Sequence, residues 1–281
     1  MEYCSHIIPL KHREDRTRIY FVGDEHLGTF ACDEQKLDET LKTIKETKNC
    51  YWVGMGDPCE FINYTDKRFD PIILSKWLQL KDLQDLAKVQ ADYFINKYKY
   101  ISLKCIGLHR GNHDESIRLK YHQDIHNYIC VALGIKSLGW SALTNLFFRS
   151  ENKSTSYILK LASEHGVGGG YYVGGKLNRA VMKTGEKEAD IFASGHVHTK
   201  NGTVEIMIGS TNTIDPDPKE IPKAIIITGT YLRTYTKGII GYGEKKSYRP
   251  TALGSPYLDI WLDRNVENHK EKNEIKMSLT L

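Results

Sequence analysis

Hydrophobic positions along the first two thirds of the chain follow two alternating spacings. Short apolar runs predict strands at residues 19–22, 50–57 and 101–106. Apolar residues three or four positions apart predict intervening helices at 37–44, about 75–99 and about 117–129, the last ending at Gly134. This alternation of strands and helices is typical of an α/β fold.

The rest of the chain is richer in strand patterns. Two strands, in "SYILKLASEHG" and "DIFASGHVH", flank a glycine-rich loop and a helix near 177–182, and further strands are predicted in "TVEIMIGST", "KAIIITGTYL" and "YLDIWLD". We therefore expect an α/β fold in which a second sheet packs on the first. We expect one domain over residues 1–263, with a helical insertion at about 61–100 that shapes substrate access, and a charged tail over 264–281.

Composition limits the classes of protein to consider. The 281 residues are 40% hydrophobic, enough for a substantial core, and the net charge of +4 permits an anionic substrate without forming a dense basic stripe. The charged N-terminal sequence shows no signal-peptide pattern, and no apolar run is long enough to span a membrane. The six cysteines form no C-x-x-C pair, so we expect reduced thiols. We expect a cytoplasmic protein, and the sequence does not indicate its oligomeric state.

The segment "FASGHVHTK" at residues 192–200 places two histidines one residue apart. Alternate side chains of a strand point to the same face, so His196 and His198 are predicted to project into one space. Two imidazoles directed at one point indicate a metal site. A single His-x-His is more often a surface or core feature, so the prediction depends on finding further ligands.

Other metal-ligand types follow the other predicted strands in order. They are Asp24 and His26 after the first strand, Asp57 and Glu60 after the second, Asn112, His113 and Asp114 after the third, and His165 after the fourth. Ligands in open α/β sheets bind at the carboxyl ends of the strands, so these loops can converge on one site. Their recurrence after successive strands makes unrelated surface positions an improbable explanation.

The chemistry of the donor set indicates which metals it suits. Carboxylate, imidazole and amide groups without thiolates favour manganese, iron, nickel or zinc over calcium or a structural zinc site. A carboxylate can bridge two cations, and Asp57 is the predicted bridge. We expect two divalent transition-metal ions, with manganese as the leading candidate, and a water between them.

The ordered blocks D-x-H, GD, GNH[DE], H and GH-x-H resemble the signature of the calcineurin-like metallophosphoesterase superfamily. They are matched by "DEH" at 24–26, "GD" at 56–57, "GNHD" at 111–114, His165 and "GHVH" at 195–198. The resemblance implies a four-layer α-β-β-α sandwich of two mixed sheets flanked by helices. It implies one metal held by Asp24, His26, Asp57 and His198, and another held by Asp57, Asn112, His165 and His196. It also implies that His113 is an acid that contacts substrate rather than metal.

Two subtypes of this superfamily are closest in these blocks. The "GNHD" block is most similar to nucleases of double-strand-break repair, while "RGNHDE" and an acid three residues after Asp57 are similar to protein phosphatases and lambda phosphatase. Glu60 stands where those phosphatases have an aspartate, and Phe61 stands where an arginine should follow. A protein-phosphatase assignment is therefore disfavoured.

Residues beside the blocks have two interpretations each. Glu60, which is favoured, or Asp114 can orient His113 through its second ring nitrogen. Either acid can instead form a solvated ion pair with Arg110 or Arg118. Arg110 is also a candidate substrate contact.

The loop "GGYYVGGKL" matches most of a phosphate-binding P-loop. Leu177 takes the place of the Ser or Thr that would bind magnesium, so an NTPase is not expected. The loop can instead approach a bound phosphate while Lys176 or Arg179 contacts it, or it can be a glycine turn leading into an amphipathic helix. The two alternatives have equal weight.

Together these residues predict phosphoester hydrolysis. Two ions acidify a bridging water and hold the phosphoryl oxygens, and a protonated His113 donates a proton to the departing alkoxide. The leading prediction is a phosphodiesterase acting on a nucleotide or nucleic acid. A phosphomonoesterase similar to lambda phosphatase is second, a non-catalytic scaffold like the retromer-type relatives of this fold is third, and a nucleotide-binding module is remote.

Overall fold

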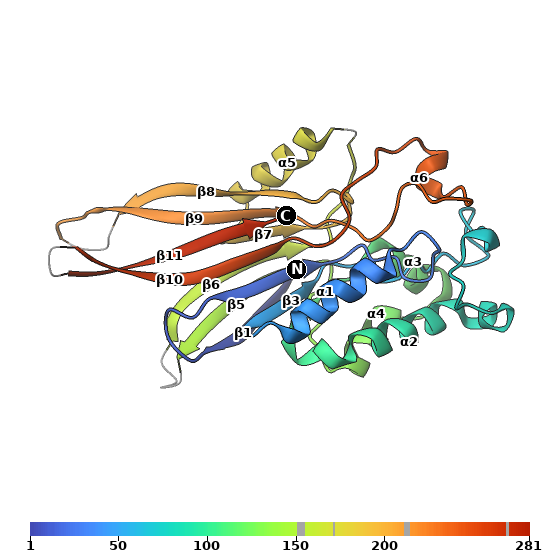
Figure 1. Ribbon diagram of the computed structural model, residues 1–281, viewed down its shortest axis with the longest axis horizontal. Coiled ribbons are helices and arrows are strands. Elements are labelled where there is room, and N and C mark those ends of the chain that lie inside the picture. Colours follow the sequence, from blue (N-terminus) through green and yellow to red (C-terminus); the bar gives the residue numbers. More distant parts are fainter. Residues whose placement is uncertain (151–154, 171, 211–213, 268–269) are drawn as a thin grey trace.

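Two mixed β-sheets form the centre of the computed structural model, which describes residues 1–281 except 151–154, 171, 211–213 and 268–269 (Figure 1). The first sheet has the order β1 (Glu2–Leu10), β5 (Ser141–Ser150), β6 (Thr155–Glu164), β7 (Ile191–Ser194), β9 (Pro218–Ile227), β8 (Asn201–Ser210). The second has the order β11 (Lys270–Thr280), β10 (Tyr257–Glu267), β2 (Thr17–Val22), β3 (Cys50–Gly54), β4 (Cys105–Leu108).

Each sheet contains a parallel segment that sets the direction of its loops. In the first sheet β6, β7 and β9 are parallel neighbours, and in the second sheet β2, β3 and β4 are parallel neighbours. Parallel neighbours end at the same edge of a sheet. The loops that follow these strands therefore leave the sheets together, as the sequence predicts.

The core between the sheets is built from the inward-facing residues of both. Phe21 and Val53 of the second sheet belong to one buried cluster with Leu146, Leu161 and Ile226 of the first. Buried and partly exposed residues alternate along most of β5, because successive side chains of a strand point to opposite faces. This packing of sheet on sheet confirms the predicted second sheet.

Helices cover the outer faces of the two sheets (Figure 1). A second buried cluster joins Trp52 of β3 to Leu37 of α1 (Glu34–Glu46), Phe94 of α2 (Leu86–Tyr98), Ile117 of α3 (Asn112–Tyr121) and Ile129 of α4 (Ile125–Leu133). On the other side, α5 (Val173–Met182) contacts β8 and β9. The predicted α-β-β-α layering of two mixed sheets flanked by helices is thus observed.

Short 3-10 turns and one short helix complete the structure. They are η1 (Pro71–Ile73), η2 (Leu80–Asp85), η3 (Lys99–Lys104), η4 (Lys183–Gly185) and α6 (Tyr242–Lys245). Lys104, at the end of η3, donates from its ammonium to the carbonyls of Ile44, Lys45 and Thr47, which satisfies the C-terminal end of α1. No helix in the described parts of the chain has both the length and the apolar character needed to cross a membrane.

Several predicted boundaries are wrong in detail. The apolar run at 101–106 is mostly η3, and β4 begins only at Cys105. The helix predicted over 75–99 becomes α2 only at Leu86. The helix predicted near 117–129 is two helices, because His122 adopts a left-handed φ of 57° and Asp124 caps α4. Its predicted end at Gly134 is confirmed, with a φ of 64°.

The chain termini form strands that the sequence interpretation missed. Residues 270–280, predicted as part of a charged tail, are β11, which pairs antiparallel with β10. Ile275, Met277 and Leu279 alternate along β11 and pack against the core between the sheets. β1 and β5 were likewise not predicted.

Three predicted segments include residues outside the described part of the chain. They are the tail (268–269), the glycine loop (171) and the strand at 203–211 (211).

Candidate metal centre

The predicted ligand residues come together at the edge where the parallel strands end. Asp24 and His26 follow β2, Asp57 follows β3, Asn112 begins α3 after β4, His165 follows β6, and His196 and His198 follow β7. Their donor atoms form adjoining groups, each with ligand atoms within 4.8 Å of one another. The convergence argued from strand order is therefore present in the structure.

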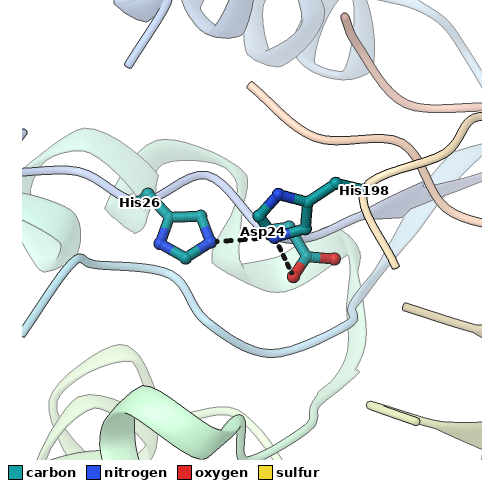
Figure 2. A group of neighbouring side chains, drawn as sticks. All are labelled: Asp24, His26 and His198. Carbon is teal, nitrogen blue, oxygen red and sulfur yellow. Dashed lines mark hydrogen bonds and ion pairs between the residues drawn. The ribbon is translucent and has the colours of Figure 1, made fainter. Parts of the chain in front are cut away.

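The first ligand group consists of Asp24, His26 and His198 (Figure 2). His26 Nε2 lies 3.1 Å from His198 Nε2, and His198 Nε2 lies 3.2 Å from Asp24 Oδ1. Asp24 is fully buried, and its Oδ1 accepts no hydrogen bond from the described residues. Three donor atoms thus face one another across a small space.

This geometry fits a cation better than it fits hydrogen bonding alone. A single proton on His198 Nε2 faces two acceptors, His26 Nε2 and Asp24 Oδ1, and cannot satisfy both, and a buried carboxylate oxygen without a donor costs free energy. Ligand atoms about 2.1 Å from one ion, at angles of about 90° to 110°, lie about 3.0–3.4 Å apart. The separations of 3.1 and 3.2 Å fall in that range.

The second ligand group consists of Asp57, His165 and His196, with Asn112 beside it. His165 Nε2 lies 3.3 Å from Asp57 Oδ2 and 3.1 Å from Asn112 Oδ1, while His165 Nδ1 donates to the carbonyl of Met55 at 2.8 Å. The carbonyl fixes the ring so that Nε2 is the nitrogen that faces the site. These four side chains match the second predicted metal position.

Electrostatics in the second group favour a positive charge between Asp57 and His165. Burial alone would lower the pKa of His165, but the Asp57 carboxylate beside it raises that pKa to about 10. Burial would raise the pKa of Asp57, but His165 holds that pKa well below its ordinary value. The pair therefore favours a positive charge at this position, which a bound cation would supply.

Glu60 supports a ligand rather than the predicted acid. Its Oε2 lies 2.8 Å from His26 Nδ1, so the carboxylate orients the ring that presents Nε2 to the first group. His113 Nδ1 instead hydrogen-bonds to the backbone carbonyl of Glu60. The prediction that the Glu60 side chain orients His113 is therefore wrong, because the carboxylate is already paired with His26.

Asp114 does not orient His113 either. Its Oδ2 accepts a hydrogen bond from the Gly111 N–H at 2.9 Å and lies 3.8 Å from His126 Nδ1. Asp114 therefore caps the start of α3, where a carboxylate accepts a backbone hydrogen bond that the helix cannot satisfy. It fixes the loop that carries Asn112 and His113.

His113 itself is buried between the two groups. Its backbone N–H donates to Asp57 Oδ1 at 2.9 Å, and its ring contacts the His26 ring edge to face at a centroid distance of 4.8 Å. Burial would lower the pKa of His113, but the charges of Asp57 and Glu60 raise it above the ordinary value. The ring is held through Nδ1, and the neighbouring carboxylates stabilise its positive charge.

The ligand loops adopt backbone conformations that most residues avoid. The φ angles are 52° for Asp24, 52° for His26, 51° for Asp57, 69° for His196 and 48° for His198. β7 ends at Ser194, so strand alternation is not what brings the two histidines together. That part of the sequence argument is wrong: left-handed turns after the strand direct both rings.

Two glycines allow the blocks to pack tightly. A Cβ at Gly111 would lie 2.0 Å from Asp57 Oδ1, and a Cβ at Gly56, whose φ is 93°, would lie 2.6 Å from His165 Nδ1. Such contacts are sterically impossible without movement of the site. The glycines of the "GD" and "GNHD" blocks are thus needed for close approach of the loops.

The three predicted substrate contacts are engaged with the protein. Arg110 forms ion pairs with Glu115 at 3.0 Å and Asp124 at 2.8 Å. Lys176 donates to the Val197 carbonyl at 3.0 Å and to Thr199 Oγ1 at 2.6 Å. The guanidinium of Arg179 packs against Gly168, so closely that a Cβ added to Gly168 would lie 2.2 Å from Arg179 Nη1.

Supporting residues behind the site were missed in the sequence. Tyr98 of α2 donates to Glu25 at 2.7 Å, and burial raises the pKa of Glu25 to about 8. Gln90 of α2 accepts from the Phe61 N–H at 2.8 Å, and Thr230 Oγ1 donates to the Asp24 carbonyl at 2.7 Å. The helix of the 61–100 segment therefore packs behind two ligand loops. No motif signals these partners, since any polar side chain of suitable length would serve.

Comparisons with known proteins show similarity of structure only. No protein-family model matches the chain, and no curated protein matches it. Vps29 from Entamoeba histolytica, solved with zinc, is similar at a TM-score of 0.39 and 9% identity over 93% of this chain and 99% of that one. Vacuolar protein sorting 29 from Cryptosporidium parvum is similar at a TM-score of 0.36 and 12% identity over 94% and 98%. Similarity at this level does not distinguish one function from another.

Proposed function

We propose that this chain is a divalent-metal-dependent phosphoesterase of the calcineurin-like type. The observation that carries the proposal is that five sequence blocks from five strand ends deliver two adjoining ligand groups to one edge of the sandwich. The donors are carboxylate, imidazole and amide groups, which suit manganese, iron, nickel or zinc. The same residue types in the same order define the superfamily that the sequence resembles.

Specific residues would hold each ion. Asp24, His26 and His198 would hold the first, Asn112, His165 and His196 would hold the second, and Asp57 would bridge them. Asp57 and His196 belong to one observed group with His165, and the bridge to the first group is part of the proposal. When bound, the ions supply Lewis-acid stabilisation of the phosphoryl oxygens and a water of lowered pKa. Manganese is our leading candidate.

The side chains of this chain would carry the remaining steps. His113, held through Nδ1 by the Glu60 carbonyl, would donate a proton from Nε2 to the oxygen of the departing group. Glu60 would keep His26 in the tautomer that presents Nε2 to the site. Asp114 would hold the "GNHD" turn in place through Gly111.

We propose a phosphodiester of a nucleotide or nucleic acid as the substrate. Similarity of the "GNHD" block to nucleases and the mildly basic composition support this choice. A phosphomonoester is the second candidate, supported by the acid at residue 60 and by the sequence "RGNHDE". A non-catalytic scaffold is the third, although the ligand set here is complete.

A comparison of matched substrates tests the proposed function. Metal-free protein is supplemented with manganese and assayed with bis-nitrophenyl phosphate, nitrophenyl phosphate and oligonucleotides at equal concentrations. We expect metal-dependent release of nitrophenol, faster from the diester than from the monoester. Faster cleavage of the monoester would favour a phosphatase, and no cleavage of any substrate by protein that binds two ions would favour the scaffold.

A further inference from the structure

A cavity of about 210 Å³ lies beside α1, and none of the proposed metal ligands lines it. Its polar wall comes from segments far apart in the sequence and includes Lys36, Thr40, Lys200, Ser255, Tyr20 and Tyr257. A cavity of this volume holds several waters, since one water occupies about 30 Å³, and therefore has room for a small polyatomic ion. The proposed function leaves this feature unused.

Two lysines meet over one glycine in this cavity. A Cβ at Gly254, whose φ is 106°, would lie 3.1 Å from Lys36 Cε and 3.9 Å from Lys200 Nζ. Lys200 Nζ donates to the Leu253 carbonyl at 3.3 Å. Among the residues that the structure describes, no carboxylate lies within 4.0 Å of either ammonium.

Hydroxyl groups and aromatic rings also line the cavity. Tyr231 donates to Thr40 Oγ1 at 3.0 Å and hydrogen-bonds to Ser255 Oγ at 2.9 Å, which fixes both hydroxyls at the cavity wall. The rings of Tyr20 and Tyr257 lie beside each other at a centroid distance of 5.0 Å. The Thr40 proton is donated to the Lys36 carbonyl at 3.1 Å, so these hydroxyls shape the cavity and the two lysines supply the attraction for an anion. Lysine is a common point-charge partner of phosphate.

We propose that this cavity is a binding site for a phosphate-class oxyanion, separate from the metal centre. An anion between Lys36 and Lys200 would relieve the repulsion of two cations that share no acidic partner. Glu39 also lines the cavity, so the positive charge is confined to the position between the two lysines, which suits a small anion better than a long polyanion. The proposal does not depend on phosphoesterase activity.

The position of the cavity gives the site access to the ligand loops. Tyr231, which fixes the hydroxyl wall, donates from its backbone N–H to the Asp24 carbonyl at 3.1 Å. Lys200 lies two residues after His198. An anion held here would therefore contact the Lys200 side chain in the segment that carries His198, and would lie one hydrogen-bonded residue, Tyr231, away from the Asp24 backbone.

Calorimetric titration of metal-free protein with inorganic phosphate tests the proposal. Removing metal with a chelator keeps phosphate from binding through ions at the metal centre, so the result is independent of the proposed function. At low ionic strength we expect saturable binding of one phosphate per chain. Lys36→Gln and Lys200→Gln should each weaken it by about tenfold, while Lys42→Gln, on the exposed side of α1, should not.

Melting temperatures of all variants confirm that each is folded before its binding is compared. A second titration with a nucleoside monophosphate distinguishes free phosphate from phosphate carried on a larger molecule. Weaker binding of the nucleotide would assign the site to the free ion, and equal or tighter binding would assign it to a phosphoryl group on a carrier. Phosphate binding that does not saturate would overturn the proposal. So would a Lys42→Gln variant that weakens binding as much as Lys36→Gln, because the attraction would then be unspecific.

Discussion

Asp57 is the residue on which the two ligand groups depend. Its Oδ2 faces His165 at 3.3 Å, its Oδ1 accepts from the His113 N–H at 2.9 Å, and its own φ is 51°. A left-handed φ at a non-glycine residue costs about 1–3 kcal/mol and persists where surrounding contacts impose it. The chain maintains this conformation to keep one buried carboxylate between a histidine ligand and the proposed acid.

Asp57→Asn should reduce metal binding at both positions. Asparagine preserves the shape and can still accept from the His113 N–H, but it removes the negative charge that a bridging ligand supplies. We expect metal content to fall from about two ions per chain to one or fewer, measured by elemental analysis after dialysis. Asp38→Asn, at an exposed position paired with Lys97, is the control. Full metal content in Asp57→Asn would contradict the bridging role.

His113→Asn should separate chemistry from metal binding. If His113 donates the proton to the leaving group, the variant keeps its metal but cleaves an unactivated diester roughly 10²–10⁴-fold more slowly. A nitrophenyl diester should lose much less, because its phenolate leaves without protonation. His122→Asn is the matched control, since residue 122 has a left-handed φ of 57° that asparagine tolerates. Equal losses on both substrates would assign His113 to phosphate binding instead.

At the scale of elements, α5 supports the loop that carries two proposed ligands, His196 and His198. Lys176 reaches from α5 to the Val197 carbonyl at 3.0 Å and Thr199 Oγ1 at 2.6 Å, on either side of His198. Burial lowers the pKa of Lys176, in keeping with an ammonium enclosed by protein. The loop it holds contains two left-handed histidines. Lys176 is therefore a positioning residue, and its ammonium is already engaged before any substrate binds.

Lys176→Met should weaken metal binding without unfolding the chain. Loss of a supporting partner of a metal ligand typically costs 10- to 100-fold in metal affinity, and we expect a loss in the lower part of that range by competition with a chromophoric chelator. Lys176→Arg should recover part of it. Lys160→Met, which removes only an ion pair with exposed Glu188, should bind metal normally. An unchanged metal affinity in Lys176→Met would show that the loop keeps its conformation without Lys176.

The sequence predicted the site better than it predicted the elements around it. The order of metal-ligand residue types after successive strands was sufficient to predict that they converge, because parallel strands such as β2, β3 and β4 end at the same edge of the sheet. The partner of the His113 ring was not predictable, because it is a backbone carbonyl and a carbonyl leaves no mark in the sequence. The ring that the Glu60 carboxylate orients was not predictable either, because His26 and His113 both lie near it and the sequence does not show which of them it pairs with.

At the scale of the molecule, two of the missed strands, β1 and β11, lie at sheet edges, while β5 lies between β1 and β6. In β1 the apolar side chains of Tyr3 and Ile7 are exposed, so the buried positions do not follow a simple apolar alternation. In β11 the inward residues Ile275, Met277 and Leu279 alternate with Lys276 and Ser278. That period of two was present in the sequence, but the preceding run of charges hid it.

A buried histidine outside the metal centre should make the fold sensitive to acid. His109 is fully buried between Ser163 Oγ at 2.8 Å and the Gly139 carbonyl at 3.1 Å, and burial lowers its pKa to about 3. The unfolded chain, with a histidine pKa of about 6.5, binds a proton first as pH falls. Stability from this group is complete above about pH 6.5 and is lost progressively between about pH 6.5 and 3.

His109→Gln should therefore flatten the dependence of unfolding free energy on pH. The wild-type slope attributable to this group is about 1.4 kcal/mol per pH unit below pH 6, and glutamine does not titrate. Urea unfolding of metal-free protein at pH 7, 6 and 5 measures it. His12→Gln, at an exposed position, is the control. A variant with the wild-type slope would show that other groups dominate acid unfolding.

The most direct test of a dinuclear phosphoesterase is the rate of diester hydrolysis as manganese is returned to metal-free protein, measured per equivalent added. With the protein concentration well above the dissociation constant for metal, we expect no hydrolysis without metal and a rate that rises until about two equivalents are bound. Asp57→Asn should show no such saturation. Hydrolysis by metal-free protein, or binding of two ions with no hydrolysis of any diester, would contradict it.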